Sequence, residues 1–149
     1  MNRVDYDEVA HLYDEPERDH GVDQNLLAFL EAKDGPLTSA VRILDVGCGT
    51  GKQLAANRRR FPDMVKVGLD RFGGMLRIAQ RRCPEAVWLL ADGARLPFSS
   101  EAFHYIINQF AYPHVRRTRQ LVTEVFRTLK PGGRSWIGRT SCRSSNLSH

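Results

Sequence analysis

The sequence predicts an α/β fold in which helices cover both faces of a doubly wound parallel sheet. Two observations lead to this fold class. Short apolar runs rich in β-branched residues alternate along the chain with segments of helical periodicity. A glycine-rich turn follows the first of these runs, and proline or glycine residues end the helical segments. The 149 residues amount to one domain of average size, which can bury its own core.

The first predicted elements surround the glycine turn. Residues 41–46 are a short β-branched run typical of a buried strand. The turn itself is Gly47-Cys48-Gly49-Thr50-Gly51. Residues 52–61 are expected to form a helix, because Pro62 stops it, and a second strand follows at residues 64–69.

The alternation of strands and helices continues toward the C-terminus. Apolar side chains share one helical face over residues 74–83 and again over residues 117–129. A lysine, a proline and two glycines at residues 130–133 end the second of these helices. Further strands are expected at residues 86–91, 103–110 and 134–137.

The two ends of the chain differ from this pattern. Residues 6–13 and 22–32 have helical character, so residues 1–40 are expected to form an N-terminal helical cap. Residues 41–138 make up the predicted α/β domain. Residues 139–149 contain four serines and no apolar period, and we expect them to be a disordered tail.

Composition excludes several classes of protein. The three cysteines are far apart, without a CxxC pair or a Cys/His ligand spacing, so neither a disulfide framework nor a metal site is expected. No apolar run approaches the ~20 residues of a membrane span, and no signal-peptide pattern occurs at the N-terminus. We therefore expect a cytoplasmic protein.

The formal net charge of +5 is unevenly distributed. The first 34 residues carry ten acidic and three basic side chains, and the rest of the chain is basic. Arginine clusters at residues 58–60 and 81–82 fall where helices are predicted to end, and cations there are favoured by the helix dipole. A nucleic-acid surface is the less favoured interpretation of the same charge.

Two phosphate-binding motifs do not fit the glycine turn. The dinucleotide motif GxGxxG needs a glycine where this chain has Lys52, since Gly51 comes one residue early. The Walker loop needs four residues between its first glycine and its Gly-Lys pair, and only three separate Gly47 from Gly51. In addition, Gln53 replaces the hydroxyl residue that would hold magnesium.

The string Ile43-Leu44-Asp45-Val46-Gly47-Cys48-Gly49-Thr50-Gly51 instead resembles the first motif of class I S-adenosylmethionine-dependent methyltransferases. Further stretches resemble that family in order and spacing, over roughly residues 5–138. They are residues 6–13, 67–70, 90–98, 103–109 and 129–133. The N-terminal stretch is similar to the small-molecule branch, which includes the ubiquinone and menaquinone biosynthesis enzymes.

The resemblance implies a Rossmann-like sheet with the strand order 3-2-1-4-5. It also implies that the family's usual sixth and seventh strands are absent here, as in a C-terminally truncated chain. The fifth strand would then be an exposed edge, through which an oligomer could form.

The resemblance also implies a binding site for S-adenosylmethionine. Asp70 would accept hydrogen bonds from both ribose hydroxyls, a role that acids at this position also have in dinucleotide folds. Asp92 would accept a bond from the adenine amino group, although a turn acid that caps the next segment is the alternative. Gly93 and Ala94 would offer backbone N–H groups to the ring, and Arg71 or Met75 would cover its face.

The remaining residues of the predicted site lie near the methionine part of the cofactor. The glycines of the turn would let the backbone pass close to it, and Asp45 would fix this turn or meet the ammonium group through water. Asn108 and Gln109 would lie beside the methyl group. The glycines are Gly47, Gly49 and Gly51.

The implied reaction is in-line displacement of the methyl group by an O, N or C atom of a small molecule. Candidate acceptor-side residues are weak: His114 as a general base, Tyr13 over the sulfonium, and Tyr112. For His114 a helix-start role without chemistry is favoured, and for Tyr13 plain packing is an equal alternative. The alternatives for the whole chain are RNA methylation and cofactor binding without catalysis.

Overall fold

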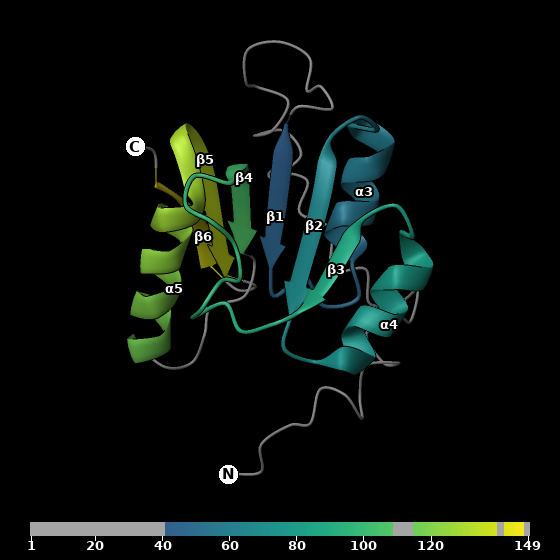
Figure 1. Ribbon diagram of the computed structural model, residues 1–149, viewed down its shortest axis with the longest axis horizontal. Coiled ribbons are helices and arrows are strands. Elements are labelled where there is room, and N and C mark those ends of the chain that lie inside the picture. Colours follow the sequence, from purple (N-terminus) through teal and green to yellow (C-terminus); the bar gives the residue numbers. More distant parts are fainter. Residues whose placement is uncertain (1–40, 109–114, 140–141, 148–149) are drawn as a thin grey trace.

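The structure is a computed structural model that describes residues 41–108, 115–139 and 142–147. Its centre is a six-stranded sheet with the order β3-β2-β1-β4-β5-β6 (Figure 1). The strands are β1 (Arg42–Val46), β2 (Val65–Asp70), β3 (Val87–Leu90), β4 (Phe103–Asn108), β5 (Leu129–Arg139) and β6 (Cys142–Leu147). The helices are α3 (Lys52–Arg60), α4 (Gly73–Arg82) and α5 (Val115–Thr128).

The predicted α/β class and the order 3-2-1-4-5 are confirmed. Strands β1 to β5 pair in parallel throughout, as expected of strands joined by crossover connections. The fifth strand begins at Leu129, so residues 129–133, expected as a turn, belong to β5. The predicted N-terminal cap, with helices at residues 6–13 and 22–32, lies outside the described residues.

The prediction for the C-terminal end was wrong in one respect. Residues 142–147, expected to be disordered, form β6, which pairs antiparallel with β5. The fifth strand is therefore not the sheet edge, and a sixth strand is present. The physical reason is that two residues suffice to join antiparallel strands, and edge pairing needs backbone hydrogen bonds rather than an apolar side-chain pattern.

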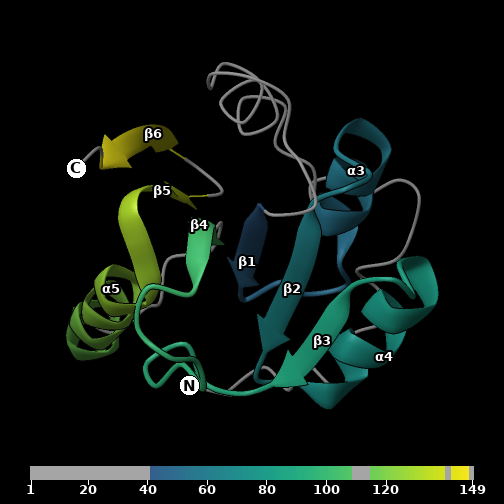
Figure 2. The same ribbon diagram turned by 45° about the horizontal axis from the view of Figure 1, so that its top comes forward.

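Helices cover both faces of the sheet, and each face has its own apolar cluster. On one face α5 packs against the sheet, and α3 packs on the other beside α4 (Figure 2). The α5 cluster consists of Leu44, Val46, Val67, Leu69, Leu96, Phe103, Ile106, Leu121, Val125 and Leu129. The α3 cluster consists of Ile43, Leu54, Met64, Tyr105, Ile107 and Trp136. This arrangement is the doubly wound one that the alternating pattern predicted.

The Trp88 ring sets the spacing between the sheet and the helices on the α3 face. A Cβ atom added to Gly68 in β2 would lie 2.3 Å from this ring, and one added to Gly51 would lie 2.8 Å from it. The indole nitrogen of Trp88 donates to the Cys83 carbonyl at 2.9 Å. The two glycines are therefore needed where the tryptophan lies against the backbone.

Other composition-based predictions can be placed on the fold. The two arginine clusters fall in the last turns of α3 and α4, as predicted. Cys48 and Cys83 are free thiols in the interior. Among the described residues, no helix is both long and apolar enough to cross a bilayer.

Candidate functional site

The carboxyl ends of β1 to β4 lie at one edge of the sheet, because these strands are parallel (Figure 1). The glycine turn follows β1, Asp70 ends β2, Asp92 follows β3 and Asn108 ends β4. In open α/β sheets, ligands bind at this edge, where the strand order reverses. Here the order reverses between β1 and β4, next to the glycine turn.

Asp70 connects the glycine turn to the second strand. Its Oδ2 accepts a hydrogen bond from the Gly49 N–H at 2.9 Å, and its Oδ1 accepts one from the Phe72 N–H at 3.0 Å. The N–H groups of Gly47 and Cys48 donate to the carbonyl of Leu69, at 2.8 and 3.0 Å. The carboxylate therefore fixes the turn from a neighbouring strand, and each of its oxygens can accept more than one hydrogen bond.

All three glycines of the turn have positive φ, but their surroundings differ. The angles are 71° at Gly47, 56° at Gly49 and 79° at Gly51. A Cβ atom at Gly51 would lie 3.2 Å from the Ala79 backbone, whereas one at Gly49 would have no atom of the described residues within 4 Å. Within the described part of the chain, Gly49 thus borders open space, while Gly51 allows α3 and α4 to pack closely. The packing role of Gly51 was not part of the sequence interpretation.

Asp45 is a buried carboxyl group beside Asp70. Its side chain lies in β1 within the interior, where burial raises its pKa well above the usual range, and the negative charge of Asp70 raises this pKa further. A cation arriving at this edge would stabilise the ionised form of Asp45. The position thus suits a positively charged group, directly or through water.

Stability should depend on pH through Asp45. Its pKa is higher in the folded chain than in the unfolded chain, where it is ~4, so the folded state binds the extra proton. Stability contributed by this group is therefore lost as pH rises from ~4 through the folded-state pKa. Asp45→Asn should remove this loss. Urea unfolding at several pH values should therefore show that the free energy of unfolding of the variant rises relative to that of the wild type as pH increases. A difference that stays constant with pH would contradict this prediction.

Asn108 offers an acceptor at the end of β4. Its Nδ2 donates to the Val46 carbonyl at 2.8 Å, which holds the amide beside the glycine turn. Its Oδ1 is buried and has no hydrogen-bond partner in the part of the chain that the structure describes. A buried acceptor without a donor is costly, so a donor from a ligand would fit there.

Asp92 is more constrained than the sequence suggested. Its Oδ1 accepts the Ala94 N–H at 3.0 Å, and its Oδ2 forms a 2.6 Å ion pair with Arg117 from α5. The Ala94 N–H, predicted to face the adenine ring, is therefore already used within the loop. The Gly93 N–H is the other predicted ring donor.

Of the other predicted site residues, the structure describes Arg71 and Met75 but not the remaining four. Met75 is buried in α4, and the guanidinium of Arg71 lies 5.9 Å from the centre of the Phe72 ring. Both lie in the chain shortly after β2, and their proposed contact with the adenine ring stays a prediction. The four remaining candidates lie outside the described residues, and they are Tyr13, Gln109, Tyr112 and His114.

Arginines contact the site region in ways that the sequence interpretation missed. Arg82, at the end of α4, donates to the Thr50 carbonyl at 2.7 Å and to its hydroxyl at 2.9 Å. Arg117 and Arg127 of α5 reach the segment between β3 and β4. The spacing of Glu124 and Arg127 signals an ion pair on one helix face, but not the loop that the pair holds.

The residues present fit the ligand that the resemblance implies. The first turn of α3 has no side-chain cap and no acidic residue, so its N–H groups suit a carboxylate. Among the residues that the structure describes, none fills the space beside Gly49 and none donates to the buried Oδ1 of Asn108. Carboxylates lie at Asp45 and Asp70. An amino acid joined to a ribose matches this set of donors and acceptors.

Similar proteins support the same assignment. The chain is 32% identical over 133 residues to the ubiquinone/menaquinone biosynthesis C-methyltransferase of Desulfotalea psychrophila, covering 87% of this chain and 54% of that protein. It is 38% identical over 98 residues to the tRNA (carboxymethyluridine(34)-5-O)-methyltransferase of Saccharomyces cerevisiae, covering 63% of this chain and 33% of that protein. The chain spans between 24% and 54% of the length of the first curated relatives that it matches.

The fold is shared with solved methyltransferases. A phosphoethanolamine N-methyltransferase of Haemonchus contortus, solved with phosphomonomethylethanolamine and S-adenosylhomocysteine, has a TM-score of 0.71 at 24% identity, covering 88% of this chain and 32% of that one. Residues 43–133 match the family described as a methyltransferase domain, and they include all of β1 but its first residue, the glycine turn and the whole of β2 to β4. The chain therefore belongs to the methyltransferase domain family.

Proposed function

We propose that the chain binds S-adenosylmethionine at the carboxyl edge of the sheet and transfers its methyl group to a small molecule. The observation that carries the proposal is the hydrogen bond between the Asp70 carboxylate and the Gly49 N–H. It joins the acid expected to hold the ribose to the turn expected to hold the methionine part. Family membership and the solved relative that holds S-adenosylhomocysteine support the choice of cofactor.

Each part of the site has a distinct task in this proposal. The carboxylate oxygens of Asp70, each of which can accept more than one hydrogen bond, accept the ribose hydroxyls, and the N-terminus of α3 receives the carboxylate of the methionine part. Asp45 and the Oδ1 of Asn108 face the ammonium group. Asp92 accepts from the adenine amino group beside its contact with Arg117. The bound cofactor supplies an activated methyl group on a sulfonium.

Alignment is the main contribution of the protein to such a reaction. In-line displacement needs the acceptor atom opposite the sulfur, and no proton transfer is required when the acceptor is already nucleophilic. Tyr13, Tyr112 and His114 remain candidates for the acceptor side, and Gln109 remains a candidate beside the methyl group. A cytoplasmic location also stays a prediction.

A small-molecule acceptor is favoured by the relatives. The Desulfotalea protein is named for C-methylation in quinone biosynthesis, and its similarity extends over most of this chain. The segment that begins at the last residue of β4, Asn108-Gln109-Phe110-Ala111, lacks the prolines found in many amino-directed DNA and protein methyltransferases. We therefore propose an O, N or C atom of a small molecule as the acceptor.

A transfer assay tests the proposed activity. The intact chain is incubated with S-adenosylmethionine carrying a labelled methyl group and with naphthoquinols, phenols, carboxylic acids or amines. We expect label in one of these classes and release of S-adenosylhomocysteine in equal amount. Cofactor binding without label in any class, RNA included, would instead support a cofactor-binding protein without catalysis.

RNA methylation is the second candidate. It is supported by the yeast relative, which is named as a tRNA methyltransferase, and by 18 arginines among the 22 basic residues. Phosphate contacts would make RNA affinity fall steeply with salt concentration. Bulk tRNA in the same transfer assay, together with a binding titration at two salt concentrations, distinguishes this candidate from the first.

A further inference from the structure

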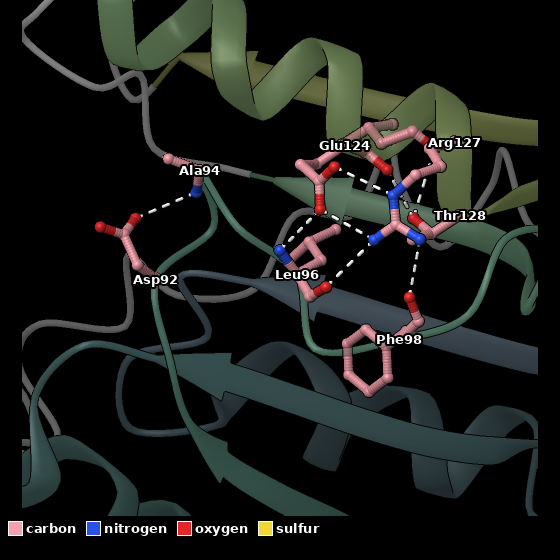
Figure 3. Close-up of polar contacts among 8 residues, drawn as sticks. Asp92, Ala94, Leu96, Phe98, Glu124, Arg127 and Thr128 are labelled. Atoms are coloured by element: carbon pink, nitrogen blue, oxygen red, sulfur yellow. Dashed lines mark hydrogen bonds and ion pairs between the residues drawn. The ribbon is translucent and has the colours of Figure 1, made fainter.

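The segment between β3 and β4 carries the residues proposed to contact the adenine ring. It has no helix or strand of its own over residues 91–102, so its shape must come from contacts with neighbouring elements. Those contacts come largely from α5, which packs on one face of the sheet. Figure 3 shows the last turn of α5 above this segment.

Arg127 and Glu124 bind the backbone of the segment together. The Nη1 of Arg127 donates to the Phe98 carbonyl at 2.7 Å, and its Nη2 donates to the Leu96 carbonyl at 3.0 Å (Figure 3). The Oε2 of Glu124 accepts the Leu96 N–H at 2.8 Å. Both polar backbone groups of Leu96 are therefore bonded to one pair of side chains.

The pair is itself held in a fixed geometry. The Nε of Arg127 donates to Oε1 of Glu124 at 2.9 Å, and its Nη2 donates to Oε2 at 2.8 Å. This two-point contact uses the planar fork of the guanidinium, which an ammonium group cannot reproduce. The hydrogen bond from Arg127 lowers the pKa of Glu124, and the same contact raises the pKa of Arg127.

We call the pair Glu124 and Arg127 the clamp. Further contacts attach the segment to α5 on both sides of the residues that the clamp holds. Downstream, the N–H groups of Glu101 and Ala102 donate to the carbonyls of Arg127 and Thr128, at 3.0 and 2.8 Å. Upstream, Arg117 from the same helix pairs with Asp92. The segment is thus attached to α5 along most of its length.

An ion pair that served only the helix would look different. Arg127 would then need only Glu124, and a partly exposed pair of this kind contributes little to stability. Instead, Nη1 passes beyond Glu124 to the Phe98 carbonyl. The side chain of Leu96, which is 4% exposed, packs in the α5 cluster, so the clamp also fixes where the loop enters the core.

We infer that Arg127, oriented by Glu124, is a positioning residue that fixes residues 92–98 in the shape that receives the adenine ring. The inference rests on the proposed function, because it needs a bound adenosyl group. Arg127 itself need not touch the ligand. It acts through the loop that carries Asp92 and Gly93.

Calorimetric titration with S-adenosylhomocysteine tests the inference. Arg127→Gln should raise the dissociation constant about tenfold, the size expected for one or two lost hydrogen bonds to a charged group. Arg119→Gln, an exposed arginine of the same helix, is the matched control and should bind like the wild type. If the wild type does not bind, the proposed function fails. If the wild type and Arg127→Gln bind equally well, only this inference fails.

A double-mutant cycle separates positioning from general destabilisation. Asp92→Asn and Arg127→Gln act on the same loop, so their combined effect on the dissociation constant should be clearly smaller than the product of the single effects. Gly49→Ala acts at the other end of the site, and its effect should multiply with that of Arg127→Gln. Multiplicative effects in both pairs would overturn the inference. If Arg127→Gln does not fold, Arg127→Lys takes its place with the same expectations, since lysine lacks the fork.

Discussion

Replacing Asp70 with alanine is expected to weaken the binding of S-adenosylhomocysteine about 100-fold or more. Two charge-assisted hydrogen bonds to the ribose would be lost, each contributing about 1.5–3 kcal/mol. The substitution also removes the acceptor of the Gly49 and Phe72 N–H groups, so the glycine turn loses its tether to β2. Calorimetric titration below the melting temperature of the variant measures this effect.

The control is an acidic residue near the amino end of β2, the end opposite to Asp70. Asp63 is an exposed acid just before β2 and far from the carboxyl edge, so Asp63→Ala should leave the dissociation constant unchanged. Asp70→Asn should give an intermediate affinity, since its amide oxygen can still accept a hydrogen bond. An affinity for Asp70→Ala within a factor of about three of the wild type would exclude Asp70 as a ribose acceptor.

Two glycines of one turn should lose stability to different extents when replaced by alanine. Gly51→Ala should lower stability by about 3 kcal/mol or more, because it combines left-handed strain with overpacking. Its Cβ would lie 2.8 Å from the Trp88 ring and 3.0 Å from the Ala79 Cβ. For a domain of this size such a loss lowers the melting temperature by about 10 °C, which thermal unfolding measures directly.

Gly49→Ala is the matched variant, with similar strain but without the clash. It should cost about 1 kcal/mol of stability, which is the strain alone. Its Cβ would enter the open space that borders the turn, so affinity for S-adenosylhomocysteine should fall about tenfold, as expected where a backbone approaches its ligand closely. Equal losses of stability in the two variants would show that the difference in their surroundings does not matter.

The sequence predicted best what local patterns determine. The strand–glycine turn–helix unit at residues 41–61 was placed within a residue, because a buried β-branched run, positive-φ glycines and a stopping proline are all local signals. The order of the five parallel strands followed from the alternation of elements together with the family resemblance. These features depend little on distant side chains.

Contacts between residues far apart in the sequence could not be predicted from local patterns. The carboxylate of Glu124 meets the Leu96 backbone 28 residues away, and nothing in the helix periodicity indicates that partner. The role of Gly51 depends on Trp88, which lies 37 residues further along the chain in β3. The strand at residues 142–147 has no apolar alternation in its sequence. It forms through backbone pairing with β5, which a local sequence pattern does not indicate.

The central claim is that this edge of the sheet binds S-adenosylmethionine rather than a dinucleotide. The most direct test is calorimetric titration of the intact chain with S-adenosylhomocysteine and, in parallel, with NAD. The account predicts saturable one-to-one binding of S-adenosylhomocysteine and no heat with NAD, in keeping with the glycine spacing at residues 47–51. Binding of NAD, or the absence of binding by S-adenosylhomocysteine, would contradict it.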